Sequence, residues 1–203
     1  MPSYTITVPN CQILGLAELY QEHLGYITNG RLVEVGAYNG YDYSNTYDLL
    51  KLGWGGLLIE PGTENYRALR VRYSNFPMVE TVEVAVSDYT GNSPLYGKGA
   101  LSSLLAANPG VVIDQRFEMV PVTTLDDILD WYGWYAGFEL LVIDTEGTEL
   151  QVLRGLDLGM WTPRMIIVET NKRDAYKNIA RHLAPLYDEV HQDLINTIYM
   201  LRR

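Results

Sequence analysis

The sequence predicts an α/β fold: a mostly parallel, seven-stranded sheet with helices on both faces. Two observations support this prediction. Short apolar runs alternate along the chain with segments whose apolar residues recur at helical spacing. The apolar runs are also nearly continuous, as in parallel strands that are buried on both faces.

The first half of the chain alternates helices with short strands. We expect a helix over about 11–24, a strand over 31–35, a helix from about 44 to 53, a strand over 57–59, a helix over about 64–73 and a strand over 82–86. Ile13, Leu16 and Tyr20 fall at helical spacing, and Gly25 and Gly53 are the expected helix ends.

The second half continues the same alternation. The run Thr124-Leu125-Asp126-Asp127 resembles a capping box and predicts that a helix begins there. Further strands are expected over 140–143 and 165–168, then a helix over about 173–184, then strands near 186–191 and 196–201. Together with the strands of the first half, these make the seven strands of the predicted sheet.

The stretch 89–122 interrupts this pattern. It is rich in Gly, Ser, Pro and Asn and is too long for an ordinary connection. We expect it to carry extra strands or to act as a lid. The chain shows no linker or internal repeat, so residues 1–203 are expected to form a single domain with this insertion.

Composition and charge exclude several classes of function. The chain has 203 residues, of which 47% are hydrophobic, so it can bury a sizeable core. Its 15 basic and 25 acidic residues give a net charge of −10, which argues against nucleic-acid binding. No apolar run is long enough to span a membrane, and the first residues lack a secretion signal. With a single cysteine, Cys11, a cytoplasmic protein is expected.

Acidic residues lie at or near the ends of four predicted strands, namely Glu34, Glu60, Asp144 and Glu169. Ligands of open α/β sheets bind at the carboxyl ends of the strands. The alternative explanation for any one of these acids is structural, because acids also occur at strand ends and cap the helices that follow. Four of them at one sheet edge would meet in one cleft, and this predicts a ligand site there.

The loop after the first strand, Gly36-Ala37-Tyr38-Asn39-Gly40, contains two glycines that allow a tight turn and a close approach to a ligand. A dinucleotide fingerprint spaces its first and last glycines five residues apart, whereas these are four apart. The spacing disfavours a nicotinamide-dependent oxidoreductase and fits the shorter glycine loop of methyltransferases. Glu60, at the end of the next strand, could accept hydrogen bonds from both hydroxyls of an adenosine ribose.

Motifs along nearly the whole chain, from about residue 12 to 200, resemble those of the FkbM-type methyltransferases. They lie at residues 33–40, 44–46, 52–61, 85–88, 124–127, 143–150, 153–155, 163–169 and 196–198. The most specific is the run I-D-x-E-G-x-E-x-x-x-L-x-G, which begins at Ile143. Val142 and Gly62 depart from the family, which often has Lys or Ser at the first position and Asn at the second. The resemblance implies a Rossmann-like methyltransferase fold and S-adenosylmethionine as methyl donor.

The resemblance also implies a map of the cofactor site. Gly36, Tyr38 and Gly40 would line the methionine part, and Glu34 also belongs to the cofactor site. Ser44 and Asn45 would bind the cofactor carboxylate at a helix N-terminus, although Ser44 could equally be a plain helix cap. Glu60 would bind the ribose, and Val86 and Ser87 would border the adenine.

The residues after the fourth strand favour an oxygen acceptor. Enzymes that methylate base amines carry an Asn/Asp-Pro-Pro-aromatic motif there, whereas this chain has Asp144-Thr145-Glu146-Gly147. A hydroxyl acceptor must lose a proton, which requires a base or a metal ion.

The candidate bases are Asp144, Glu146 and His191. The candidate ligands for Mg²⁺ are Asp144, Glu169 and Asn171, a set similar to that of catechol-type O-methyltransferases. Without a metal, Asp144 would contact the cofactor instead, and Glu146 or Glu149 would cap the following helix.

We therefore expect an enzyme that O-methylates a sugar or another small hydroxylated metabolite. Its expected partner is a small-molecule or glycan acceptor, not a nucleic acid or a membrane, and a homodimer is compatible with the sequence. One alternative is a non-catalytic module that binds the cofactor and uses an aromatic cluster as its interface, made of Trp131, Tyr132, Trp134 and Tyr135. Another is a metal-independent methyltransferase that acts on a different acceptor.

Overall fold

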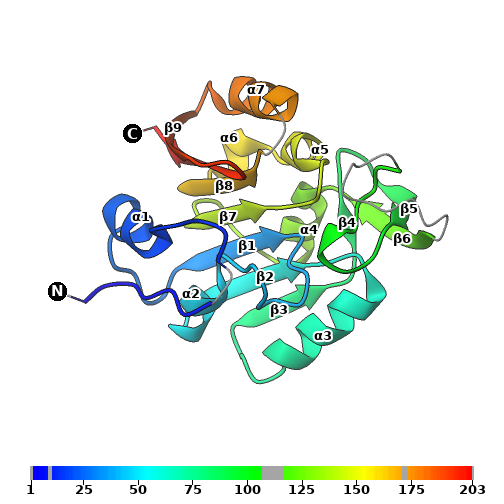
Figure 1. Ribbon diagram of the computed structural model, residues 1–203, viewed down its shortest axis with the longest axis horizontal. Coiled ribbons are helices and arrows are strands. Elements are labelled where there is room, and N and C mark those ends of the chain that lie inside the picture. The colour runs from blue at the N-terminus through cyan, green and yellow to red at the C-terminus, as the bar shows by residue number, and fades with distance from the viewer. Residues whose placement is uncertain (1, 9–10, 107–116, 171–172, 203) are drawn as a thin grey trace.

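A seven-stranded sheet forms the centre of the protein, in a computed structural model that describes residues 2–8, 11–106, 117–170 and 173–202 (Figure 1). The strand order is β3-β2-β1-β7-β8-β10-β9. The strands are β1 (Arg31–Val35), β2 (Gly55–Ile59), β3 (Val79–Val82), β7 (Leu140–Ile143), β8 (Met165–Glu169), β9 (Tyr187–Gln192) and β10 (Asn196–Leu201). All neighbours pair in parallel except β10, which is antiparallel to both β8 and β9. The predicted α/β fold with a mostly parallel sheet is confirmed.

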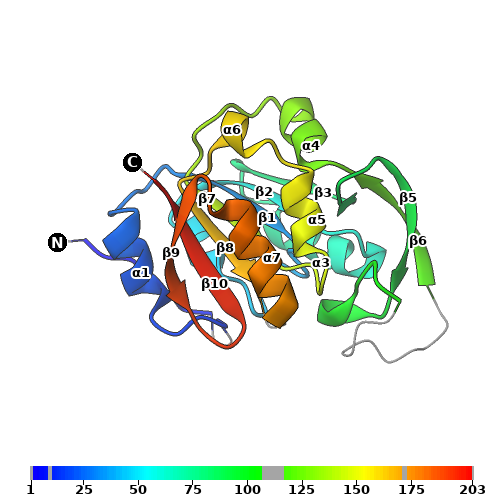
Figure 2. The same ribbon diagram turned by 90° about the horizontal axis from the view of Figure 1, so that it is seen from above.

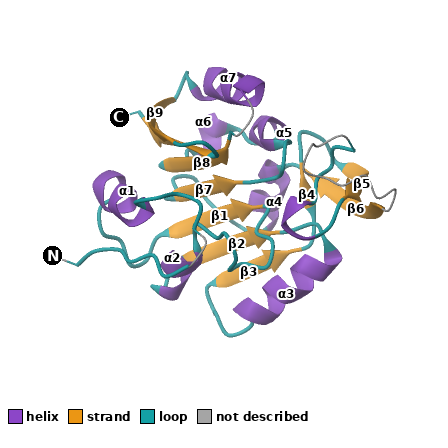
Figure 3. Ribbon diagram, viewed as in Figure 1, coloured by secondary structure: helices purple, strands orange, loops and turns teal. Residues whose placement is uncertain are grey.

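Helices cover both faces of the sheet (Figures 2 and 3). One face packs against α1 (Leu16–His23), α2 (Tyr47–Lys51) and α3 (Thr63–Tyr73). The other packs against α4 (Leu125–Trp131), α5 (Glu149–Arg154), α6 (Leu158–Trp161) and α7 (Arg173–Leu183). Within the part of the chain that the structure describes, no helix has the length and hydrophobicity needed to cross a membrane.

Alternate side chains of each central strand enter the two cores. In β1, Val33 and Val35 pack in the core beneath α4 and α5, whereas Leu32 packs in the core beneath α1 and α2. Glu34 therefore lies on the α2 side, near the carboxyl end of its strand. The burial of both faces explains why the strands read as continuous apolar runs.

A second, three-stranded sheet lies beyond the carboxyl ends of the central strands (Figure 1). Its order is β4-β6-β5, with β4 at Ala85–Val86, β5 at Gly91–Tyr96 and β6 at Phe117–Thr123. The extra strands predicted within 89–122 are thus present. The single strand predicted over 82–86 is wrong, because β3 ends at Val82 beside Ile59 and β4 pairs with β6 in the other sheet.

The first helix is shorter than predicted. It begins at Leu16 instead of near residue 11, because Gly15 at its N-cap has a left-handed backbone with φ of 75°. The helix expected from about 44 to 53 is also reduced, to the five residues of α2. In contrast, the capping box of α4 is confirmed, since the Thr124 hydroxyl accepts a hydrogen bond from the Asp127 amide.

Gly36 allows the ends of β1 and β7 to meet. Its φ is +86°, and a Cβ at this position would lie 1.7 Å from the backbone oxygen of Asp144. The Gly36 amide donates to Ile59 at the end of β2, and the Asp144 amide donates to Val35 at the end of β1. The carboxyl ends of three neighbouring strands therefore converge on a position that has no room for a side chain.

This contact predicts a large loss of stability for Gly36→Ala. The new methyl group would collide with the backbone of Asp144 and would also occupy a left-handed conformation. Gly133→Ala is the matched control, because Gly133 also has positive φ (+64°) but nothing lies within 4 Å of its Cβ position. By chemical denaturation, we expect the control to lose about 1–2 kcal/mol and Gly36→Ala clearly more. Equal losses would show that the collision is relieved at no cost.

Candidate functional site

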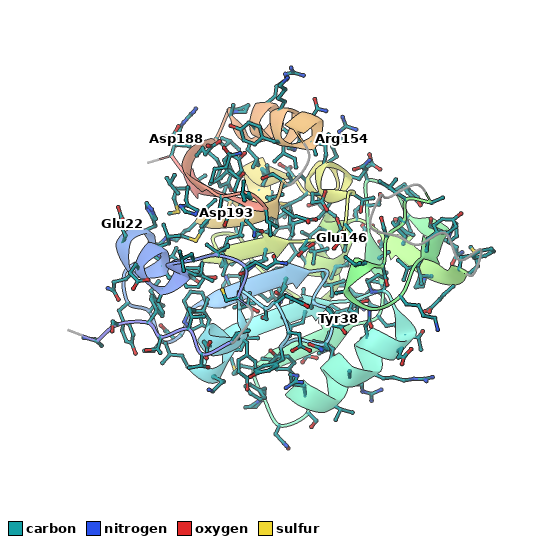
Figure 4. All side chains as sticks on the ribbon, viewed as in Figure 1. Glu22, Tyr38, Glu146, Arg154, Asp188 and Asp193 are labelled. Atoms are coloured by element: carbon teal, nitrogen blue, oxygen red, sulfur yellow. The ribbon has the colours of Figure 1, made fainter. Side chains whose placement is uncertain are left out.

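Two adjoining cavities lie at the carboxyl ends of the central strands, where the strand order changes direction between β1 and β7. The cavity that we call the Glu60 cavity is lined by residues that include Gly36, Tyr38, Glu60, Val86 and Asp144. The second, the Glu146 cavity, is lined by residues that include Glu34, Tyr38, Ser44, Asn45, Asp144 and Glu146. Figure 4 labels Tyr38 and Glu146 at this edge of the sheet. Open α/β sheets bind their ligands at such a switch point.

Glu60 is oriented by three hydrogen-bond donors. Its Oε1 accepts from the Gly62 amide (2.9 Å) and from Asn65 Nδ2 (3.1 Å), and its Oε2 accepts from the Tyr38 amide (3.0 Å). Burial raises the pKa of Glu60 from 4.5 to about 7, although the three donors act in the opposite direction. The carboxyl group is thus fixed in direction while it lines the cavity.

Apolar side chains form a wall of the Glu60 cavity, and Val86 is among them. The others include Ile59, Val84, Leu95 and Leu104. A flat apolar ring fits such a wall. Ser87, predicted to border the same ligand, is not among the lining residues. Its backbone oxygen would lie 2.2 Å from a Cβ at Gly155, so this part of the chain packs closely against the end of α5.

The start of α2 forms part of the Glu146 cavity. Ser44 Oγ accepts hydrogen bonds from the amides of Thr46 (3.2 Å) and Tyr47 (3.1 Å), so its hydroxyl stabilises the turn that leads into α2, whose N-cap is Thr46. Asn45 is 5% exposed and lines the cavity. Because α2 has only five residues, its dipole gives little support to an anion site.

Glu34 lies beside this helix start, buried with 5% exposure. Its Oε2 accepts a hydrogen bond from Thr46 Oγ1 at 2.7 Å. Burial raises the pKa of Glu34 from 4.5 to about 7 despite this bond, and the nearby Asp144 adds to the increase.

Three carboxyl groups gather at the ends of β7 and β8. One carboxylate oxygen from each of Asp144, Glu146 and Glu169 lies within 4.8 Å of the other two. A side-chain hydrogen bond joins Asp144 to Glu169. Burial is the main cause that raises the pKa of both, and the neighbouring carboxyl charges raise it further. A proton shared by this pair relieves the repulsion between the two acids.

The loop that carries Glu146 is held by Glu149, one of the two glutamates named above as a possible cap of the following helix. Glu149 Oε1 accepts from the amides of Thr145 (3.1 Å) and Gly147 (2.7 Å) and from the Thr145 hydroxyl (3.1 Å). Glu149 is the second glutamate of the I-D-x-E-G-x-E run, so the motif contained a signal for it. Glu146 itself has a left-handed backbone with φ of 56°.

Several predicted residues lie away from the cavities. His191 is on β9, two strands from β8, and lines neither cavity. Gly40 also lines neither, and it packs instead against Leu69 and Tyr73 of α3. Asn171 lies outside the described residues.

The aromatic cluster of the interaction-module alternative is at the opposite edge of the sheet. Tyr135 packs on Arg31, the first residue of β1, with the guanidinium carbon 4.0 Å from the ring centre. Trp131 of the same cluster is 85% exposed. These rings therefore do not contact a ligand in the two cavities.

The buried carboxyl groups predict that stability depends on pH. The pKa of Glu34 is higher in the folded protein than in the unfolded chain, so its contribution is complete below about pH 4.5 and is lost as the pH rises through about 7. We expect the unliganded protein to melt at a lower temperature at pH 8 than at pH 5. Glu34→Gln should reduce the difference in the free energy of unfolding between these two pH values by up to about 3 kcal/mol. Glu64→Gln, at an exposed position on α3, is the control, and equal pH profiles for both variants would contradict the assignment.

Solved structures with the same fold include methyltransferases. The METTL16 MTase domain superposes with a TM-score of 0.58 at 13% identity, covering 98% of this chain and 70% of that one. Precorrin-6y C5,15-methyltransferase from Geobacter metallireducens GS-15 gives 0.52 at 11% identity, covering 98% and 94%. SMU.1697c from Streptococcus mutans, in complex with SAH, gives 0.52 at 10% identity, covering 94% and 100%. At these identities the likeness shows the fold alone, and it confirms the Rossmann-like methyltransferase fold.

The sequence comparison identifies the family. No curated protein matches the chain significantly. Residues 34–198, however, match the family described as Methyltransferase FkbM domain, and this range includes both the glycine loop and the I-D-x-E-G-x-E run. Because the match covers most of the chain, this protein belongs to the FkbM-type methyltransferases.

Proposed function

We propose that this protein transfers a methyl group from S-adenosylmethionine to a hydroxyl group of a sugar or another small metabolite. The observation that carries the proposal is the oriented Glu60 carboxyl group, which faces an apolar cavity behind the Gly36 loop and beside a cluster of carboxyl groups. The fold supports the choice of donor, since one similar structure, SMU.1697c, was solved with SAH.

The residues of the Glu60 cavity fit an adenosine. Glu60 would accept hydrogen bonds from the ribose hydroxyls, and the apolar wall around Val86 would contact the adenine. Gly36, Tyr38 and Asp144 line both cavities, so the two cavities adjoin and one extended ligand would occupy both. We place the methionine part in the Glu146 cavity, near Glu34 and Asn45.

The carboxyl cluster supplies a base for the acceptor. When bound, the cofactor provides the electrophilic methyl group. Glu146 and Asp144 line the cavity in which an acceptor hydroxyl would lie, and one of them would accept its proton. Burial moves the pKa of Asp144 upward, closer to neutral pH, where a carboxylate is a more effective base. The hydrogen bond with Glu169 favours the charged form of Asp144, which is the form that accepts a proton.

A divalent cation is the second way in which these residues could act. The oxygens of Asp144, Glu146 and Glu169 are close enough to share one ion, and carboxylate oxygens suit Mg²⁺. The ion would replace the proton shared by Asp144 and Glu169 and would help to orient an acceptor hydroxyl. The predicted third ligand, Asn171, lies outside the described residues, and among the described residues Glu146 belongs to this cluster.

The ribose assignment predicts that Glu60→Ala weakens donor binding. Removal of a hydrogen-bonded carboxylate costs about 1–3 kcal/mol, which corresponds to a loss of affinity of about five- to a hundredfold. Calorimetry with S-adenosylhomocysteine measures it. Glu64→Ala, an exposed glutamate on the neighbouring α3, should bind like the wild type. Unchanged affinity in Glu60→Ala would remove Glu60 from the cofactor site.

The acceptor assignment predicts that Glu146→Gln slows transfer while donor binding remains. A positioned base contributes about 10²–10⁴-fold to rate. The assay is transfer of a labelled methyl group to a panel of neutral mono- and oligosaccharides, with and without EDTA. Activity that persists in EDTA and falls in Glu146→Gln supports the base. Activity that stops in EDTA and returns with Mg²⁺ instead assigns the metal role, and donor binding without transfer to any acceptor would favour the non-catalytic module.

A further inference from the structure

One segment of the insertion, residues 99–105, lies across both cavities, and we call it the roof segment. It begins with the short helix η1 (Gly99–Leu101). Ser102, Ser103 and Leu104 line the Glu60 cavity, Leu101 lines the Glu146 cavity, and Ala100 lines both. Any ligand that fills the two cavities would therefore contact this segment.

Asn65 ties the roof segment to the candidate ribose carboxylate. Its Nδ2 lies 3.1 Å from Glu60 Oε1 and 3.1 Å from the backbone oxygen of Gly99. Asn65 belongs to α3 and is 8% exposed, so helix packing fixes its side chain. One amide group thus holds both the carboxylate and the start of the roof segment.

Ser103 ties the other end of the roof segment to the loop after β7. Its hydroxyl donates to the backbone oxygen of Glu146 at 3.0 Å and accepts from the Leu105 amide at 3.1 Å. The backbone of Ser103 also exchanges two hydrogen bonds with Tyr96 at the end of β5. With 1% exposure, Ser103 is a buried link between the small sheet and the residue that we propose as a base.

We propose that Asn65 and Ser103 are positioning residues that hold the roof segment against the bound nucleoside and thereby control how fast the cofactor product leaves. The inference rests on the proposed function. In this proposal the roof segment moves away from the cavities as the ligand leaves, and such a movement would break the hydrogen bonds of Asn65 to Gly99 and of Ser103 to Glu146. Removal of either bond makes the movement easier and loosens the partner that the bond holds, Glu60 or the Glu146 loop.

Release of S-adenosylhomocysteine from Asn65→Ala and Ser103→Ala tests the inference. A neutral hydrogen bond is worth about 0.5–1.5 kcal/mol, so release should be about two- to tenfold faster in each variant, with a matching rise in Kd. Stopped-flow measures the rate and calorimetry the affinity. Ser103→Thr, which keeps the hydroxyl, should restore slow release. Ser74→Ala is the control, because the Ser74 hydroxyl also donates to a backbone oxygen but lies at the end of α3.

Melting temperatures separate positioning from a purely structural role. A structural role would lower the melting temperature of Ser103→Ala and leave the release rate unchanged, which would overturn the inference. If Ser103→Ala fails to fold, the release rate of S-adenosylhomocysteine from Asn65→Ala tests the inference instead. If the wild type itself does not bind S-adenosylhomocysteine, the proposed function fails. If the wild type binds and both variants release the product at its rate, only the present inference fails.

Discussion

The close approach of Gly36 to the backbone of Asp144 is the constraint on which the site depends. A Cβ at Gly36 would lie 1.7 Å from the Asp144 oxygen, so the chain can place the end of β7 against the end of β1 only with glycine there. The amides of Gly36 and Ala37 donate to Ile59, which also brings in the end of β2. The residues that follow each strand are thereby gathered at one edge.

This convergence places acids close together in a buried setting. Burial disfavours the charged forms of Glu34, Glu60 and Asp144. Different hydrogen bonds offset this cost for each of the three carboxyl groups. Glu60 has three donors, Glu34 has the Thr46 hydroxyl, and Asp144 has a hydrogen bond with Glu169. Such perturbed groups in a cavity are typical of functional sites, where a ligand supplies the charge or the hydrogen bonds that the folded chain lacks.

The backbone conformation at the site supports the same interpretation. Within the described residues, four non-glycine residues have positive φ, and three of them line the Glu146 cavity: Tyr38, Tyr43 and Glu146. Each such conformation costs about 1–3 kcal/mol and persists only where the surrounding structure enforces it. Glu149 enforces the loop around Glu146 through its hydrogen bonds to Thr145 and Gly147.

Much of this fold could be predicted from the sequence, because buried parallel strands appear as apolar runs and acids and glycines mark the ends of these strands. The break between β3 and β4 could not, since Val82, Val84 and Val86 keep alternating through it and only the distant β6 decides where β4 pairs. The distance of His191 from the cavities depends on the order of the last strands, which local patterns do not fix.

The candidate site, too, could be predicted only in part. Glu34, Glu60 and Asp144 can be singled out from the sequence because they lie at or near strand ends, and Glu146 because it belongs to the I-D-x-E-G-x-E run; the structure places all four around the two cavities. Asn65 was missed, because its role arises from a contact with Gly99 across 34 residues of sequence.

The structure of the protein with bound S-adenosylhomocysteine tests the central claim most directly. Our account predicts that the ribose hydroxyls lie within hydrogen-bond distance of the Glu60 carboxylate, with the adenine against Val86 and the homocysteine sulfur toward the Glu146 cavity. A nucleoside bound elsewhere, or bound in this cavity with its ribose turned away from Glu60, would contradict it.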